Sequence, residues 1–292
     1  MKQVVFICPV YDMRNHFDLA VELYQSKIQY SITEDLYFVF SNAEQQDKLC
    51  NRIKEQIGET PKSIVLPENM LSYKSQINVK KFYALKKLKD SYSYLFVIDC
   101  ETKFVKHGDF FEVAEDIWTY KTMLNATLSS DAWSLVLRPC FKALGLQGNI
   151  TLLKETRGWQ YNIWFNEIST YRSDTLNDFF SWLEHFDKNK YLNAWACFDY
   201  HLYAAFLILE KGYHLIRHKN YKARQGYVEA LNKISTYSST EKIESLKILR
   251  THWTSDSSIT TNNTYLLCQQ DRQGANVTVC DCGGAFASIS ID

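Results

Sequence analysis

The sequence lacks an excess of either charge. Lys and Arg together number 33, and Asp and Glu also number 33, over 292 residues. A chain with this balance gives no electrostatic reason to expect binding to a phosphate backbone or an anionic membrane surface. We therefore expect no nucleic-acid partner and, at most, peripheral contact with a membrane.

Long apolar runs and paired cysteines are lacking too. No stretch reaches the roughly 18 apolar residues that a membrane-spanning helix needs, and the apolar run after Met1 is too short for a secretory signal. Only Cys280 and Cys282, of eight scattered cysteines, lie close together, which is weak evidence for zinc. Reduced thiols in a cytosolic chain fit this pattern better than a disulfide framework. The expected location is the cytoplasm, including the inner face of the membrane.

Two glycine-rich nucleotide signatures are also missing. No Gly-x-Gly-x-x-Gly follows the first apolar segment, which excludes the usual dinucleotide fingerprint, and no Gly-Lys-Ser/Thr phosphate loop occurs. The first apolar segment ends instead in Cys8-Pro9-Val10-Tyr11. This is unlike the Gly-rich loop of a sugar nucleotidylyltransferase, which we keep as an alternative enzyme class because it shares the nucleotide-binding topology.

The first hundred residues alternate between short apolar segments and helical patterns. Strands are predicted over 4–8, 36–40, 63–66 and 94–98, and helices over 16–30, 43–57 and 76–88. This alternation predicts an α/β fold, with a Rossmann-like, mostly parallel sheet, right-handed crossovers and helices on both faces.

The later residues change character at about position 220. The pattern before this point predicts a helix over 108–124, a strand over 133–137 and a helix over 176–186, and residues 227–250 have an amphipathic helical pattern. Residues from 254 are rich in Ser, Thr and Asn, with a last hairpin predicted near 276–280. We expect a catalytic domain at 1–220, with halves 1–105 and 106–220, and a helical C-terminal appendage with an irregular tail at 221–292.

The predicted strand at 94–98 runs directly into two acids, Asp99 and Glu101. In open α/β sheets, ligands bind just outside the carboxyl ends of the strands, where these acids fall. Two carboxylates that leave a buried strand together are costly unless a positive group joins them, and a divalent cation that carries a phosphate-linked ligand is one candidate. The alternative is that Asp99 caps a turn while Glu101 is solvated.

The arrangement of acids along the chain resembles that of the GT-A class of nucleotide-sugar glycosyltransferases, particularly the bacterial polysaccharide-type enzymes. The matching motifs are Asp99-Cys100-Glu101 and, about a hundred residues later, a helix that opens at Asp199 and ends at Gly212-Tyr213. The resemblance covers about residues 3 to 220. Many members have Asp-x-Asp where this chain has Asp-Cys-Glu, and Glu is also an oxygen donor for a hard cation.

The resemblance implies a role for each matching residue. Asp99 and Glu101 would hold Mn²⁺ or Mg²⁺ against the donor diphosphate, and His218 would complete the coordination, with His214 as the alternative. Asp199 would be the general base of an inverting reaction, because the start of a helix stabilises a charged carboxylate. Donor contacts would come from Pro9, Tyr11, Asp12, Lys80, Lys81 and Asp99, and the acceptor wall from Trp159, Tyr161, Trp164 and Glu167.

Each of these residues also has an ordinary structural interpretation. Pro9, Tyr11 and Asp12 fit a turn that ends a strand, and Asp199 fits a helix-capping acid. Lysines on a helix usually form a solvated face, a lone His after a strand is usually a surface or packed residue, and dense aromatic residues usually fill a core.

These observations predict a metal-dependent glycosyltransferase of the hexosyltransferase type. It would move a sugar from a nucleotide-sugar donor, with a UDP-sugar favoured, to a hydroxyl of a glycan or glycolipid. A non-catalytic carbohydrate-binding or scaffold protein with a degenerate GT-A fold is the alternative from another class, and metal-dependent binding of a nucleoside diphosphate would separate the two. A glycoside hydrolase is disfavoured, because its two acids lie on opposite sides of the scissile bond. The sequence leaves the sugar, the linkage and the oligomeric state open.

Overall fold

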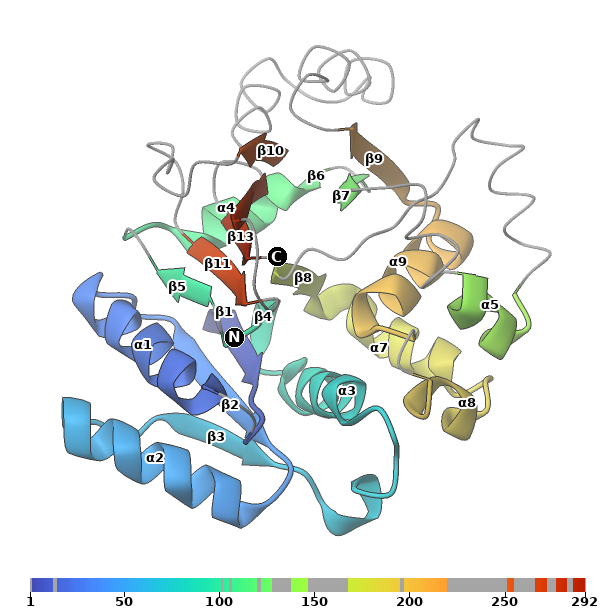
Figure 1. Cartoon of the computed structure of the whole chain (residues 1–292). Helices are drawn as coiled ribbons and strands as arrows, with labels where there is room; N and C mark the ends of the chain where they lie inside the picture. The colour runs from blue at the N-terminus through green and yellow to red at the C-terminus, as the bar shows by residue number, and fades with distance from the viewer. Residues whose placement is uncertain are drawn as a thin grey trace.

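The computed structural model (Figure 1) describes residues 2–12, 15–100, 102–104, 107–119, 122–127, 138–146, 168–194 and 197–219, together with four strands between 251 and 291. The first hundred residues alternate as the sequence predicts. Their elements are β1 (Lys2–Pro9), α1 (His16–Gln29), β2 (Asp35–Phe40), α2 (Ala43–Ile57), β3 (Lys62–Val65), the 3₁₀ helix η1 (Glu68–Met70), α3 (Gln76–Leu88) and β4 (Tyr92–Ile98).

A five-stranded sheet with the order β3-β2-β1-β4-β8 forms the centre of this part of the chain. The first four strands are parallel, and β8 (Ile168–Arg172) is antiparallel to β4. The sequence prediction of a mixed α/β fold with a mostly parallel sheet is therefore confirmed.

The core lies against both faces of this sheet. Phe6 of β1 is fully buried, and its ring packs against Phe96 of β4, Phe104 of β5 (Thr102–Phe104) and Phe110 of α4 (Phe110–Ile117), with centroids 5.0–5.3 Å apart. Over the other face, stacked rings of Phe82 in α3 and a phenylalanine of α7 (Ser173–Leu183) join these two helices. Side chains that are apolar on both faces explain why β1 and β4 read as continuous apolar runs.

The order of the strands creates a switch point between β1 and β4. The chain leaves β1 toward β2 on one side and returns through α3 to β4 on the other side. Connections that depart in opposite directions open a crevice outside the carboxyl ends of these two strands, which is where open α/β sheets bind ligands. In this chain, Tyr11 and Asp99 follow those two strand ends.

The residues after β5 form smaller elements. Among the described residues up to 219, the remaining helices and strands are β6 (Trp118–Thr119), β7 (Thr122–Thr127), α5 (Arg138–Leu144), α8 (Lys188–Leu192), α9 (Asp199–Glu210) and β9 (His214–Lys219). The predicted helix over 108–124 is wrong beyond Ile117, where β6 and β7 begin a three-stranded sheet with β9. Threonines and a tryptophan favour strands here over a longer helix. The predicted strand over 133–137 lies outside the described residues.

In the C-terminal part, the described residues form four strands: β10 (Thr251–Thr254), β11 (Leu266–Asp271), β12 (Val277–Cys282) and β13 (Phe286–Ile291). The prediction of an irregular tail is wrong for these residues, which form a sheet in the order β10-β12-β13-β11-β5. The hairpin predicted near 276–280 falls on β12, which pairs with β13. Strand β11 pairs with β5, far away in sequence, and such partners are not visible in a local pattern. The predicted helices over 227–250 lie outside the described residues.

Within the described ranges, no helix has both the length and the apolar character needed to cross a membrane.

Candidate active site

At the carboxyl end of β1, Tyr11 lies against a buried lysine. The ammonium of Lys80 is 3.9 Å from the centroid of the Tyr11 ring and donates a hydrogen bond to the carbonyl of Val10. Burial lowers the pKa of Lys80 to about 8. Burial, and then the charge of Asp99, raise the pKa of Tyr11, whose hydroxyl has no hydrogen-bond partner among the described residues. Lys80 therefore holds the Tyr11 ring in place at the switch point.

At the carboxyl end of β4, Asp99 faces a second lysine of α3. The ammonium of Lys81 is 4.0 Å from Oδ1 of Asp99 and 3.8 Å from Oδ1 of Asp199. The Lys81 side chain is 8 % exposed and that of Asp99 24 %. Burial is the main cause that raises the pKa of Asp99; Asp199 acts in the same direction, and Lys81 and His16 oppose it. One ammonium thus lies between two carboxylates from distant parts of the chain.

The second carboxylate is fixed from the opposite side by a tyrosine of β8. Asp199 is the first residue of α9 and is 1 % exposed, and its Oδ2 accepts a hydrogen bond from the hydroxyl of Tyr171. Burial, followed by the charge of Asp199, raises the pKa of Tyr171 well above its usual range. We call Lys81, Asp99, Tyr171 and Asp199 the Lys81 cluster.

Consecutive residues of α3 join the two sides of this site. Lys80 reaches the end of β1, while Lys81 reaches the end of β4 and the start of α9. The backbone N–H of Ser75, the residue before α3, donates a hydrogen bond to the carbonyl of Leu192, and the side-chain amide of Asn78 in the first turn of α3 donates one to the carbonyl of Ala194. The helix therefore connects the first half of the chain with the segment that leads into α9.

The structure brings together five of the residues that the sequence analysis predicted for the site: Tyr11, Lys80, Lys81, Asp99 and Asp199. Pro9 ends β1 beside them. Asp12 is 45 % exposed, and both its oxygens accept hydrogen bonds from Lys48 of α2, at 3.1 and 3.0 Å. The general interpretation of lysines as a solvated face is wrong for Lys80 and Lys81, which are 0 % and 7 % exposed.

Other predicted site residues are not placed by the structure. Glu101 and the predicted acceptor wall of Trp159, Tyr161, Trp164 and Glu167 lie outside the described residues. His218 belongs to β9, where its backbone is in register with Ala126 of β7, and the position of its side chain is not described. The metal roles of Glu101 and His218 therefore stay predictions.

The described side chains test only part of the expected metal site. Asp99 and Asp199 supply the carboxylate oxygens that Mn²⁺ and Mg²⁺ prefer. Among the described residues, no group of three or more His, Cys, Asp or Glu side chains could hold a metal ion. The charges of Lys80 and Lys81 formally balance those of Asp99 and Asp199. A divalent cation at this position would therefore need a further negative charge, which the carboxylate of Glu101 could add.

Sequence reasoning missed two members of the site. Tyr171 lies in β8 at a position that no motif marks, and only its antiparallel pairing with β4 brings it to Asp199. His16 opens α1, and its ring is 6.4 Å from that of Tyr11 between centroids. The position of His16 just after a strand end was the only signal for it, and that signal is common to many loops.

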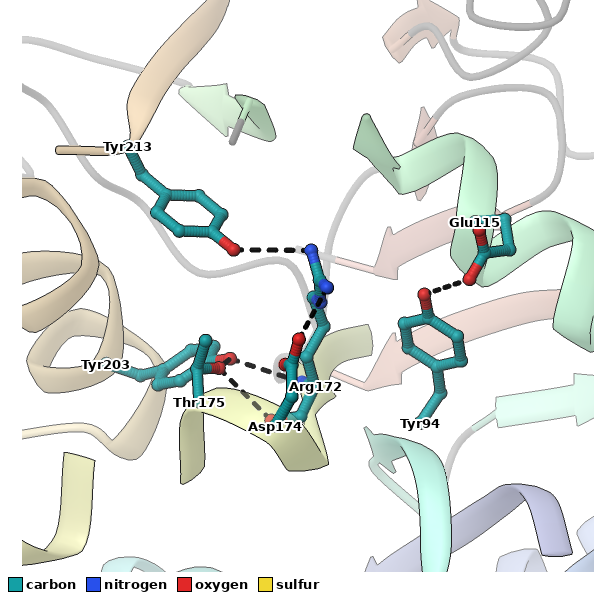
Figure 2. Close-up of polar contacts among 7 residues, drawn as sticks. All are labelled: Tyr94, Glu115, Arg172, Asp174, Thr175, Tyr203 and Tyr213. Carbon is teal, nitrogen blue, oxygen red and sulfur yellow. Dashed lines mark hydrogen bonds and ion pairs between the residues drawn. The ribbon is translucent and has the colours of Figure 1, made fainter. Parts of the chain in front are cut away.

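A second polar cluster begins at the next residue of β8. Figure 2 shows Arg172 with one guanidinium nitrogen 3.2 Å from the Tyr213 hydroxyl and another 2.6 Å from Oδ2 of Asp174. The Tyr203 hydroxyl accepts a hydrogen bond from the backbone N–H of Arg172, at 3.1 Å, and lies 2.5 Å from the Thr175 hydroxyl. We call these five residues the Arg172 cluster.

Beside the Arg172 cluster, the hydroxyl of Tyr94 in β4 donates a hydrogen bond to Glu115 of α4 (Figure 2). This pair resembles the Tyr171–Asp199 pair in chemistry but not in burial. Glu115 is exposed, whereas Asp199 is enclosed.

Comparison with known proteins adds no relative to these observations. No protein-family model matches the chain, and a search of curated proteins finds no match.

Proposed function

We propose that this protein is a glycosyltransferase that binds a nucleotide-sugar donor at the carboxyl ends of β1 and β4. The support is the position of Tyr11, Lys80, Lys81 and Asp99 at the switch point of a mostly parallel sheet. An aromatic ring suits a nucleobase, ammonium groups suit phosphates, and a carboxylate suits ribose hydroxyls or a cation.

The observation that carries the proposal is the sharing of Lys81 between Asp99 and Asp199, at 4.0 and 3.8 Å. Buried ionisable groups with shifted pKa values are expensive for stability and cluster at functional sites. Here the two acids are the ones to which the GT-A resemblance gives donor and acceptor roles. Their convergence on one ammonium supports a single site that serves both substrates.

The proposed reaction breaks the bond between the sugar C1 and the donor diphosphate and forms a bond from C1 to the acceptor oxygen. The acceptor proton passes to Asp199, and the nucleoside diphosphate leaves with the bonding electrons. Lys81 can neutralise part of the negative charge on the leaving group. A divalent cation, held by Asp99 and Glu101, would stabilise the same charge when bound.

One observation favours a second function, that of a non-catalytic nucleotide-sugar or carbohydrate-binding protein. Asp199 is 1 % exposed, and its two oxygens already face Tyr171 and Lys81. A base must receive a proton from an acceptor hydroxyl within hydrogen-bond reach. If Asp199 keeps these contacts in the donor complex, the site binds the donor without activating an acceptor.

A thermal-shift screen of nucleoside-diphosphate sugars, with and without Mn²⁺, tests the proposed function. We expect at least one UDP-sugar to raise the melting temperature, and the same screen on Asp99→Ala to show no such increase. The matched control is Asp174→Ala, which removes an acid of the Arg172 cluster and should preserve the increase. A wild-type protein that no nucleotide sugar stabilises would contradict the proposal. Release of UDP on addition of a glycan acceptor would separate the enzyme from the binding protein.

A further inference from the structure

The Lys81 ammonium lies between two acids and at direct hydrogen-bond distance from neither of their Oδ1 atoms. Charge-assisted hydrogen bonds between an ammonium and a carboxylate are usually about 2.7–2.9 Å long. The observed distances are 3.8 Å to Asp199 and 4.0 Å to Asp99. Lys81 therefore serves both carboxylates at once, and a small displacement of its flexible stem would change the balance between them.

The contacts that Asp199 makes conflict with the role of a general base. Its Oδ2 accepts the Tyr171 hydrogen bond and its Oδ1 faces Lys81, in a side chain that is 2 % exposed. Both oxygens are therefore engaged before an acceptor hydroxyl arrives. For Asp199 to act as a base, one of these oxygens must become available to the acceptor hydroxyl.

We propose that Lys81 couples the two substrates, because the diphosphate of the donor draws the Lys81 ammonium from Asp199 and thereby leaves Oδ1 of Asp199 available for a hydrogen bond from the acceptor hydroxyl. This inference rests on the proposed function and names Lys81 as the residue that carries the coupling. The negatively charged diphosphate replaces Asp199 as a counter-charge for Lys81. The Tyr171 hydrogen bond keeps the carboxylate in position during this exchange.

Coupling of this kind is reciprocal. If donor binding weakens the Lys81–Asp199 pair, then loss of the Asp199 charge must strengthen the binding of the diphosphate by the same free energy. Asp199→Asn is the suitable change, because the amide keeps an oxygen that can accept from Tyr171. We expect it to lower the Kd of UDP by ~5-fold or more, within the usual range of such couplings.

Isothermal titration calorimetry with UDP, inorganic pyrophosphate and uridine tests the inference. Asp199→Asn should tighten UDP and pyrophosphate and leave uridine unchanged, because uridine has no phosphate for Lys81. Asp174→Asn should alter none of the three. Equal Kd values for UDP in wild type and Asp199→Asn would overturn the inference and leave the proposed function standing. A wild type that binds neither UDP nor pyrophosphate would overturn both.

A double-mutant cycle then asks whether the coupling passes through Lys81 or acts through space. In a Lys81→Met background, Asp199→Asn should change the Kd of UDP by less than about 2-fold, within the error of additivity. The same tightening in both backgrounds would show a direct charge effect and overturn the inference. If Lys81→Met does not fold, Lys81→Gln, which also removes the charge but keeps a polar group beside both carboxylates, takes its place in the same cycle, because uncharged uridine does not separate coupling through Lys81 from direct charge repulsion.

Discussion

Two polar clusters start from adjacent residues of β8 and differ in the distances between their charged groups. Successive strand residues point to opposite faces, so the side chains of Tyr171 and Arg172 leave the sheet on different sides. In the Arg172 cluster, Asp174 and Tyr213 contact the guanidinium directly, at 2.6 and 3.2 Å. In the Lys81 cluster, the ammonium is 3.8 and 4.0 Å from its two acids.

Exposure separates one ion pair of each cluster as well. The side chains of Arg172 and Asp174 are 26 % and 56 % exposed, whereas those of Lys81 and Asp199 are 8 % and 2 % exposed. A partly exposed ion pair with direct contacts is typical of a structural connection. A buried ion pair with separated charges is costly for folding and is typical of a site that is organised for a ligand. This difference favours a structural role for the Arg172 cluster and agrees with the proposed binding role of the Lys81 cluster.

The largest expected effect on stability comes from removal of the central cation in each cluster. Lys81→Met should lower the free energy of unfolding by about 3–5 kcal/mol, because it leaves the buried Asp199 and the half-buried Asp99 without that counter-charge. Arg172→Met should lower the free energy of unfolding by a smaller amount, about 1.5–3 kcal/mol. The loss is smaller because water can solvate Asp174 when the guanidinium is removed. Urea unfolding followed by circular dichroism measures both. If Arg172→Met loses more unfolding free energy than Lys81→Met does, the Arg172 cluster would be the more costly of the two to disrupt, contrary to this expectation.

A smaller effect is expected from the two tyrosine–carboxylate hydrogen bonds. Tyr171→Phe should lower the free energy of unfolding by about 1–3 kcal/mol, because Asp199 loses a donor in an enclosed site. Tyr94→Phe should lower it by about 1 kcal/mol or less, because water can replace the hydroxyl at the exposed Glu115. The two variants remove the same atom, so each is the control for the other in urea unfolding. Equal losses of unfolding free energy in the two variants would show that burial does not distinguish the two tyrosine–carboxylate hydrogen bonds.

The pH dependence of stability tests the burial of Lys80. Its pKa in the folded chain is about 8, below the ordinary value of 10.5. Between these values the unfolded chain binds the proton and the folded chain releases it, so stability rises with pH in this window. The unfolding free energy of wild type, minus that of Lys80→Met, should therefore increase from pH 8 to pH 10. Chemical unfolding across this range measures it, and a flat difference would contradict a buried, deprotonated amine.

The smallest effect is expected at the exposed pair of Asp12 and Lys48. Lys48→Ala should change the free energy of unfolding by less than about 1 kcal/mol, as is usual for surface ion pairs. Asp12→Asn should weaken UDP binding less than Asp99→Asn does, because Lys48 already engages both Asp12 oxygens. Calorimetry with UDP measures this order. A stronger effect of Asp12→Asn would restore Asp12 as a principal donor contact.

The sequence predicted the first half of the fold well because each element there carries its own signal. The apolar runs of β1 and β4 and the helical spacing of α2 and α3 are local features that the parallel sheet preserves. Helix α4 stops at Ile117 and the C-terminal strands pair with distant partners, and neither property is visible in a short window. Local patterns therefore failed where long-range pairing decides the structure.

The candidate site also has one part that the sequence indicates and another part that only the packing of the elements creates. Asp99 was predicted because it follows a recognisable strand, and the roles of Tyr11 and Asp199 were predicted from the resemblance to GT-A enzymes. The burial of Lys80 and Lys81 and the contact of Tyr171 with Asp199 depend on how α3 and β8 pack on the sheet. A sequence pattern shows that a residue lies on a helix or strand, but the packing of that element decides what the side chain meets.

A calorimetric titration of UDP in the presence of Mn²⁺ tests the central claim most directly, with Asp99→Asn from the Lys81 cluster and Asp174→Asn from the Arg172 cluster compared with wild type. We predict that wild type and Asp174→Asn bind UDP with the same affinity and that Asp99→Asn loses at least ~10-fold, about 1.4 kcal/mol. Absence of binding by wild type, or equal affinity in all three proteins, would contradict a donor site at the carboxyl ends of β1 and β4.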